Sequence, residues 1–324
     1  MNALEFTAIR KSFADLVAVD DLSFQVRDGE VFGFLGGNGA GKTTSLRMVL
    51  DIIRPDEGAI SIFGRPPDRK RSGEIGFLPE ERGLYRTMKV LDTIVYYGQL
   101  KGMSAADARA EGRALLERFG LAAFERTRID KLSKGMAQKV QLATAVVNKP
   151  RLLILDEPFS GLDPLNQGLL EDEIRRARDG GATVIFSTHV MQHAERLCDR
   201  LLLLAKGRKR FEGTQDEARA LLPARLSVIT RADAATLPGV QSADAGAPLA
   251  GDGGDGWREW EVKLVPGVDP GDVLERCVAE GVPLRRFEQQ RASLHDAFVH
   301  IVGPSFIDST GKPTPNKPSQ GEAA

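Results

Sequence analysis

The chain has 324 residues, of which 42% are hydrophobic and 27% charged, a composition typical of an ordinary soluble globular protein of about two domains. Its 44 basic residues nearly balance its 45 acidic residues, so no excess of positive charge points to nucleic acid or an anionic membrane surface. Its two cysteines, Cys198 and Cys277, have no metal-ligand spacing and suit a reducing compartment.

The first 215 residues have the pattern of an α/β protein. LEFTAIRKSF and AVDDLSFQV alternate like antiparallel strands, and VFGFL (31–35) leads through a glycine loop into a helical stretch, KTTSLRMVLDII (42–53). LLILD (152–156) and TVIFST (183–188) are short aliphatic runs of the kind that form buried parallel strands. These runs predict a central parallel sheet with helices between its strands.

Two further segments are predicted to be helical. Residues 87–148 lack strand-like runs and are expected to form a helical insertion. In one of its helices, SAADARAEGRALLERFG, Ser104 and Asp107 have capping-box spacing and Gly120 marks the end. The other segment, PLNQGLLEDEIRRAR, is predicted to place four apolar residues on one face, namely Leu165, Leu169, Leu170 and Ile174.

The composition changes after residue 215. DAGAPLAGDGGDG (244–256) is expected to be a flexible acidic loop, and it lacks the ligand pattern of a calcium loop. WREWEVKLV and LRRFEQ predict strands, whereas DPGDVLERCVAEG and SLHDAFVHIV carry helix-capping signals. These elements predict a small α+β domain over 225–302, and the Pro-, Ser- and Gly-rich tail, 303–324, is predicted to be disordered.

The segment GGNGAGKT (36–43) fits the phosphate-loop pattern, with Gly36, Gly41, Lys42 and Thr43 at the defining positions. Glycines let backbone N–H groups converge on phosphates, Lys42 can reach the β- and γ-phosphates, and the Thr43 hydroxyl can ligate magnesium. A chance glycine turn before a helix is the alternative. The apolar strand before the loop and the helix after it favour the phosphate loop.

Four polar residues follow two of the predicted strands. Asp156 closes LLILD, where a carboxylate can hold magnesium through water, and Glu157 stands where a general base for an attacking water would lie. Taken alone, Glu157 could be an acidic turn residue, Asp163 a helix N-cap before proline, and His189 a helix-entry residue. Together, and in this order, they point to one site for nucleotide hydrolysis.

The segment LSKGM (132–136), called the Ser133 turn below, begins another predicted helix. A small hydroxyl and a glycine at a helix start can cradle an anion. Yet the chain already has a phosphate loop about ninety residues earlier. Alone, the Ser133 turn could be an ordinary Ser-capped helix start.

With these motifs in this order, residues 3–215 resemble the ATP-binding subunit of an ABC transporter, and the Ser133 turn resembles that family's signature motif. For residues 3–215 the resemblance implies an α/β fold: a phosphate-loop NTPase cassette with a mixed sheet, an N-terminal antiparallel β part and a helical insertion. The small C-terminal α+β domain predicted above follows this cassette. It implies an ATPase that uses ATP and Mg²⁺. It also implies that two copies pack head to tail, so that each ATP lies between the phosphate loop of one copy and the Ser133 turn of the other.

Residue roles carried over from the family follow the matching positions. Glu157 would be the catalytic base, His189 would contact the γ-phosphate and the attacking water, and Lys42 would bind phosphate. The resemblance assigns nucleotide binding to Phe13, Gly36, Asn38, Gly39, Gly41, Lys42, Thr43, Thr44, Glu80, Ser133, Gly135 and Asp163. It assigns magnesium to Thr43, Asp156 and Glu80.

The sequence departs from the common family pattern at several of these positions. Gly37 stands where Pro is frequent, Phe13 where Tyr is frequent, and LSKGM replaces LSGGQ. Glu80, in IGFLPEERGLY (75–85), occupies the place of a glutamine, although the register could also slip to Glu81. A carboxylate is a good magnesium ligand, but it adds negative charge beside ATP. The set PEERGLY, LSKGM and DEPFSGLDP, with the C-terminal appendage, resembles the sodium-extrusion branch of ABC exporters.

All three tyrosines, Tyr85, Tyr96 and Tyr97, lie in one short stretch. In the family this region receives the coupling helix of the membrane subunit, and tyrosine is favoured at interface anchors. We therefore expect a transmembrane permease to dock near Leu84 and Tyr85. The alternative is that the rings only pack the helical insertion.

The leading interpretation is an ATP-hydrolysing subunit that powers export by a separate permease, works as two copies and binds no nucleic acid. No signal peptide is apparent and the longest aliphatic run, LLLLA, falls short of the ~20 residues that span a bilayer, so we expect a cytoplasmic protein held at the inner face of the membrane by its permease. One alternative is a soluble ABC ATPase acting on ribosomes or nucleic acid, which the single cassette and balanced charge do not favour. A second is a non-catalytic ATP switch, against which the intact catalytic set argues.

Overall fold

The structure is a computed structural model that describes residues 1–81, 83–248 and 256–303. By its internal contacts the chain divides into two compact units, Met1–Gln215 and Asp216–Ile301, with Val302 grouped with the first unit. The predicted disordered tail from 304 onward, and residues 249–255 of the predicted acidic loop, lie outside the described residues.

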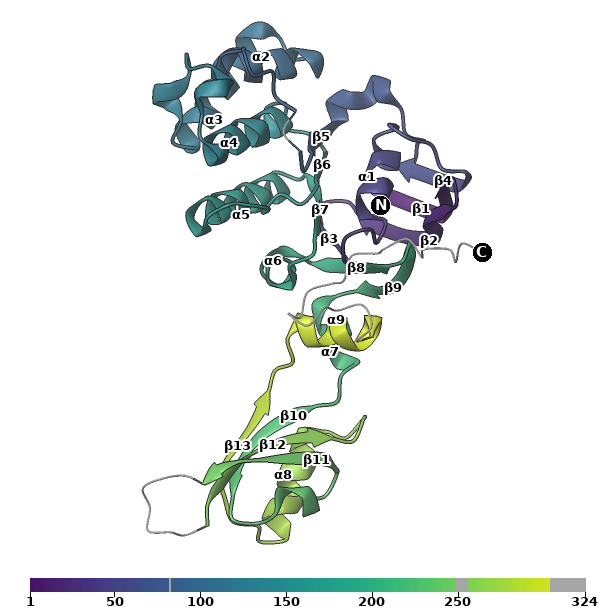
Figure 1. Cartoon of the computed structure of the whole chain (residues 1–324), viewed down its shortest axis with the longest axis vertical. Coiled ribbons are helices and arrows are strands. Elements are labelled where there is room, and N and C mark those ends of the chain that lie inside the picture. Colours follow the sequence, from purple (N-terminus) through teal and green to yellow (C-terminus); the bar gives the residue numbers. More distant parts are fainter. Residues whose placement is uncertain (82, 249–255, 304–324) are drawn as a thin grey trace, which may run out of the picture. The chain divides into compact units, whose positions relative to one another are not determined.

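A six-stranded sheet in the order β5-β6-β7-β3-β8-β9 forms the centre of the first unit (Figure 1). Its strands are β3 (Val31–Leu35), β5 (Ile75–Leu78), β6 (Leu152–Leu155), β7 (Thr183–Thr188), β8 (Arg200–Ala205) and β9 (Arg208–Gly213). All neighbours pair in parallel except β8 and β9. Every residue of β3, β6 and β7 is buried, which fits the predominantly apolar sequences of these strands.

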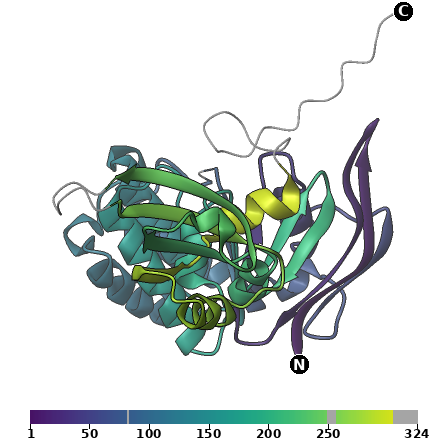
Figure 2. The same ribbon diagram turned by 90° about the horizontal axis from the view of Figure 1, so that it is seen from below.

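A three-stranded antiparallel sheet lies beside it in the order β2-β1-β4. Its strands are β1 (Asn2–Phe13), β2 (Leu16–Arg27) and β4 (Glu57–Ile62), of which β1 and β2 are the long paired strands near the N-terminus in Figure 2. Helix α1 (Lys42–Val49) packs between the two sheets, where Leu46 and Met48 join one apolar core with Phe24 and Ile154. The helix ends at Val49 rather than at 53, because Asp51 adopts a left-handed conformation (φ 51°).

The remaining helices of the first unit agree with the predicted pattern in most respects. They are α2 (Val90–Leu100), α3 (Ala105–Arg118), α4 (Lys134–Val146), α5 (Pro164–Asp179) and α6 (Met191–Leu197), with short 3₁₀ turns at Arg69–Glu74, Ala122–Phe124 and Ile129–Lys131. The Ser104 hydroxyl accepts a hydrogen bond from the Asp107 backbone N–H, as the capping pattern predicts. The prediction for Leu165 was wrong: its side chain is 83% exposed, because the buried face of α5 begins only at Leu170.

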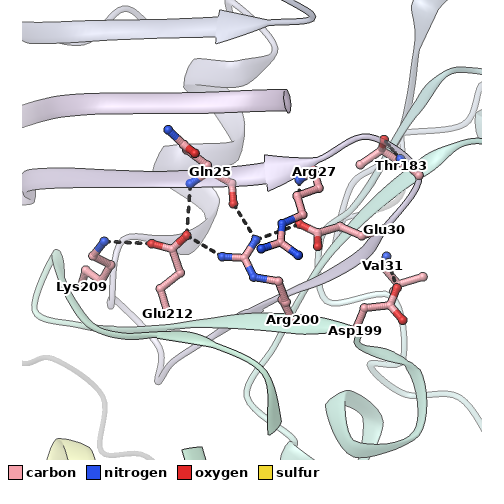
Figure 3. A network of polar contacts seen from close by, with 10 residues as sticks. Gln25, Arg27, Glu30, Val31, Thr183, Asp199, Arg200, Lys209 and Glu212 are labelled. Atoms are coloured by element: carbon pink, nitrogen blue, oxygen red, sulfur yellow. Dashed lines mark hydrogen bonds and ion pairs between the residues drawn. The ribbon is translucent and has the colours of Figure 1, made fainter. Parts of the chain in front are cut away.

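A polar network joins the antiparallel sheet to the β8–β9 edge of the central sheet (Figure 3). The Arg200 guanidinium donates to the Gln25 carbonyl at 3.2 Å, to Glu30 Oε1 at 3.2 Å and to Glu212 Oε1 at 2.9 Å. Burial raises the pKa of Glu30, although Arg27 and Arg200 oppose this. Because three acceptors from three segments bind one guanidinium, this network holds the two sheets together.

The second unit is a four-stranded antiparallel sheet in the order β11-β12-β10-β13. Its strands are β10 (Arg225–Thr230), β11 (Val240–Pro248), β12 (Arg258–Leu264) and β13 (Leu284–Gln290), and its helices are α7 (Gln215–Ala220), α8 (Pro270–Ala279) and α9 (Leu294–Val302). Val273 and Cys277 of α8 pack on Val262 and Leu264 of β12. Residues 244–248 belong to β11 rather than to a loop, since this segment pairs with β12. No helix in the described ranges has the length and apolarity needed to cross a membrane.

Candidate active site

A cavity of about 410 Å³ opens at the N-terminus of α1. It is lined by Phe13, Leu16, Val17, Ala18, residues 37–44, Glu80 and Glu157. A Cβ at Gly41 would lie 2.7 Å from the Ala18 carbonyl oxygen, and one at Gly36 2.5 Å from that of Leu204, so the loop can close over these positions only with glycine. Within the described chain no side chain caps α1, so its first N–H groups remain available to an anion.

Lys42 is the single cation among the described residues that line this cavity. Its side chain is 6% exposed, and its Nζ donates to the carbonyl oxygens of Gly36 at 2.7 Å and Gly37 at 3.2 Å. Nζ also lies 3.2 Å from Glu157 Oε1, which balances its charge. The loop therefore holds a buried ammonium group beside free N–H donors, a combination that fits a phosphate chain.

Asp156 and Glu157 stand at the end of β6 and are fixed by Ser187 at the end of the neighbouring strand β7. The Glu157 backbone N–H donates to Ser187 Oγ at 2.8 Å, and Ser187 Oγ donates to Asp156 Oδ1 at 2.6 Å. Glu157 has a left-handed backbone (φ 46°), which is uncommon for a residue with a side chain and is often found at functional sites. No local sequence pattern singles out Ser187, which lies one residue before the end of β7 and two residues before His189.

The Thr43 hydroxyl lies 3.4 Å from Asp156 Oδ1, so the structure brings together two of the three expected magnesium ligands. The described residues contain no cluster of three His, Cys, Asp or Glu side chains that could hold a metal. Magnesium is commonly held by one or two carboxylates together with substrate phosphates and water. The Thr43–Asp156 pair at the mouth of the phosphate loop fits that kind of site.

His189 lies on the other side of the Glu157 carboxylate. Its Nδ1 is 3.0 Å from Glu157 Oε2, a distance at which Nδ1–H donates to the carboxylate. Burial opposes ionisation of Glu157, but the hydrogen bond from His189 and the charge of Lys42 outweigh it and lower the pKa of Glu157. Glu157 is thus an ionised carboxylate held between an ammonium group and an imidazole.

Glu80 lines the same cavity, close to two other acids. Its pKa is raised by burial and by the negative charges of Asp156 and Glu157, while Lys42 lowers it. A bound divalent metal ion would relieve the repulsion among the three carboxylates. In its absence Lys42 offsets only part of that repulsion, so an ionised Glu80 reduces the stability of the fold.

Replacing Glu80 by Gln is expected to raise the melting temperature of the nucleotide-free protein by about 1 to 2 °C at pH 8. The folded chain holds the Glu80 proton more tightly than the unfolded chain, so stability falls as the pH rises through the interval between the two pKa values. Above that interval Glu80 is ionised in both states and the substitution helps most. Below about pH 4 the carboxyl is protonated in both, and variant and parent should melt together.

Thermal unfolding between about pH 4 and pH 8 measures this difference, with Glu81→Gln, the same change one residue along the chain, as the control. An equal gain at both ends of the range would contradict the electrostatic cause. A higher melting temperature in Glu81→Gln alone would indicate that Glu81, rather than Glu80, occupies the position of the family's glutamine.

The remaining predicted residues divide into two groups. Phe13 lines the cavity and is 46% exposed, as an aromatic platform for a base would be. The Ser133 turn does not line it: Ser133 Oγ accepts a hydrogen bond from the Met136 N–H at the start of α4. Asp163 is also absent from the lining and caps α5 by accepting from the Asn166 N–H, which lowers the pKa of Asp163. Two segments assigned to nucleotide binding by the resemblance therefore lie outside the cavity of their own chain.

Comparisons with known proteins agree with this arrangement. Residues 19–160 match the family described as ABC transporter. The chain is 40% identical over 299 residues to the uncharacterised ABC transporter ATP-binding protein YhaQ of Bacillus subtilis, covering 91% of this chain and 97% of that protein. It is 35% identical over 321 residues to the Nod factor export ATP-binding protein I of Burkholderia lata, covering 94% and 98%. A solved structure of the ATP-binding subunit of an ABC transporter has a TM-score of 0.64 at 32% identity, covering 68% of this chain and 92% of that one.

Proposed function

This chain belongs to the family of ABC transporter ATP-binding proteins, and from that premise we propose that it hydrolyses ATP to drive export through a separate transmembrane permease. Its enzymatic activity is the conversion of ATP and water to ADP and phosphate. The proposal rests on one observation: Glu157 contacts both Lys42 and His189 beside a loop whose N–H groups can bind phosphate. Export as the direction is supported by the likeness to the Nod factor export protein.

The first step is phosphate binding by the loop. The N–H groups at the start of α1 and Lys42 Nζ face the cavity, and the phosphates bring several negative charges to them. Lys42 then has a stronger partner than the Glu157 carboxylate. When the Lys42 ammonium group binds phosphate instead of Glu157, one of the interactions that lower the pKa of Glu157 is weakened.

Release of Glu157 from Lys42 prepares it as a general base. A carboxylate with a higher pKa accepts a proton from water more readily, and His189 continues to orient it through Nδ1. Thr43 and Asp156 would hold magnesium, which neutralises charge on the phosphates when bound. The ion pair with Lys42 thus keeps Glu157 a weak base until a nucleotide binds.

We propose that two copies complete each site. Ser133 and Asp163 are exposed in their own chain and do not line its cavity, so a second chain would be needed to bring them to the nucleotide. In this arrangement Ser133 Oγ and the Gly135 N–H would contact a γ-phosphate held by the partner. ATP binding would close the pair, and hydrolysis would open it.

The two units have different proposed roles. Residues 1–215, with the helical insertion at 87–148, would be the ATP-binding domain. Residues 225–302 would be an accessory domain that modulates contacts between the two copies. The likeness to YhaQ covers 91% of this chain and so extends beyond the first unit.

The permease is proposed to dock beside the tyrosine cluster. A groove of about 360 Å³ is lined by Phe77, Leu84 and Tyr97, among others. Tyr85 is 54% exposed, and its ring meets the edge of Tyr96 with centroids 5.8 Å apart. Tyr85 directly follows Leu84 of the groove lining, and exposed aromatic rings next to a groove with apolar and charged lining residues suit an amphipathic helix from a membrane protein.

Changing Leu84 and Tyr85 together to Ala is expected to weaken membrane association about tenfold or more, since such aromatic anchors dominate interface energies. Neither residue lines the nucleotide cavity, so ATP hydrolysis by the isolated protein should stay within about twofold. The measurement is the membrane-bound fraction of the tagged chain in its native host. Phe124→Ala, a 38% exposed ring on the same helical insertion, is the matched control. Unchanged membrane association in the double variant would remove this docking site.

A further inference from the structure

Helix α4 carries the Ser133 turn at its start and two glutamines further along. Gln138 and Gln141 are three positions apart, a spacing that places them on neighbouring parts of one helix surface. Gln138 Nε2 donates to the Pro158 carbonyl at 2.9 Å. Gln141 Nε2 donates to the carbonyls of Pro79 at 3.3 Å and Glu81 at 3.2 Å. One helix therefore binds the backbone of two separate loops.

Each of those carbonyls is adjacent to a residue of the active site. Pro158 directly follows Glu157, and Pro79 and Glu81 flank Glu80. Gln141 is only 4% exposed, so its hydrogen bonds are formed in a buried environment, where unpaired polar groups are unfavourable. A shift of either loop must break these bonds or move α4.

The start of α4 also touches the loop that follows Pro158. A Cβ at Gly135 would lie 3.1 Å from Asn166 Nδ2, and one at Gly161 would lie 2.7 Å from Lys134 Nζ. Asn166 Nδ2 in turn donates to Asp163 Oδ2 at 2.6 Å. The Ser133 turn therefore lies against the segment 161–166, which follows Glu157 and contains Asp163, within one chain.

We infer that Gln138 and Gln141 are positioning residues that couple a chain's own ATP site to the Ser133 turn it offers to its partner. The inference rests on the proposed function, because it presupposes that the Ser133 turn completes the partner's site. An α-helix of 13 residues is about 20 Å long and is stiff, so loop movements at Pro79, Glu81 and Pro158 are carried to its N-terminus. Occupancy of one site would then set the geometry of the other, which makes hydrolysis cooperative in ATP.

The test uses the full-length chain with Gln138→Met and Gln141→Met combined, which keeps side-chain length and removes the N–H donors. Lys139→Met is the control on the same helix, because Lys139 Nζ donates to the Phe119 carbonyl inside the helical insertion. Three quantities are measured: the Kd of a fluorescent ATP analogue for the dilute chain, kcat, and the Hill coefficient for ATP. We expect the double variant to keep its Kd within about twofold, to lose about tenfold or more in kcat, and to show a Hill coefficient near one.

Parental kcat and Hill coefficient in the double variant would overturn the inference, as would an equal loss in Lys139→Met. If the double variant does not fold, Gln138→Met alone, at a half-buried position, is expected to lower kcat about threefold at unchanged Kd. Parental values in that variant would equally overturn it. Absence of ATP hydrolysis in the parental protein is a different failure, since it would overturn the proposed function and the coupling with it.

Discussion

Replacing Glu157 by Gln is expected to lower kcat for ATP hydrolysis by about 10² to 10⁴-fold, while ATP binding is retained. The amide keeps the shape of the carboxylate but cannot accept a proton from water. Since hydrolysis opens the proposed pair of chains, its loss should also trap ATP-bound dimers. Single-turnover hydrolysis measures the first effect, and light scattering with and without ATP measures the second.

The control for this change is Glu117→Gln, an identical substitution at an exposed position of α3. It should leave kcat within about twofold of the parent. Hydrolysis by Glu157→Gln within about tenfold of the parent would show that another group takes the proton. A monomer under saturating ATP would contradict the two-copy site.

Replacing Lys42 by Met is expected to weaken ATP binding about 100-fold or more and also to destabilise the nucleotide-free protein. The binding loss follows from removing the single cation of the cavity lining in the described chain. The stability loss follows because Glu157, 9% exposed, keeps its negative charge without an ion-pair partner. Breaking a buried pair typically costs about 3 to 5 kcal/mol, and access of water from the open cavity should bring the cost toward the lower value.

The two effects can be separated by a double-mutant cycle. Lys42→Met combined with Glu157→Gln removes both charges, so its melting temperature should recover toward that of the parent, whereas ATP binding should stay weak. The deficit of Lys42→Met alone should also shrink at low pH, where the unpaired Glu157 takes up a proton. A double variant that melts no higher than Lys42→Met would show that the buried ion pair is not what Lys42 stabilises.

The phosphate loop could be predicted from the sequence because its determinants are local. A strand, a glycine turn and a helix follow one another between 31 and 49, and each is specified by its own residues. Asp156 and Glu157 could also be predicted from the sequence, because they directly follow a buried aliphatic strand. His189 directly follows β7, the next strand along the sheet, and the parallel strands β6 and β7 bring their carboxyl ends together.

Other features depend on contacts that no local pattern encodes. Ser187 lies in a buried strand beside Phe186 and Thr188, and only the fold shows that its hydroxyl joins Asp156 to Glu157. The motifs assigned Lys42 to the phosphates and Glu157 to the attacking water, and the ion pair between these two residues appears only in the folded chain. Residues 244–248 have the composition of a loop, yet pairing with β12 makes them a strand, since tertiary context overrides propensity.

The incomplete cavity is a further example of a non-local feature. Motif spacing placed the Ser133 turn near a phosphate but could not say in which chain. The structure leaves this turn outside the cavity that holds Lys42, and Gln138 and Gln141 connect it to the loops of its own active site. The family resemblance explains why the Ser133 turn lies apart from the phosphate loop of its own chain. The hydrogen bonds of α4 suggest how the turn responds to that chain's own active site.

The most direct measurement identifies the proteins that bind this chain in the cell. The tagged Glu157→Gln chain would be expressed in its native host, gently solubilised with ATP, and its companions identified by mass spectrometry. We expect a polytopic membrane protein at equal stoichiometry with the ATP-binding chain. Ribosomal proteins or nucleic acid in its place would contradict the assignment as the energy-converting subunit of a transporter.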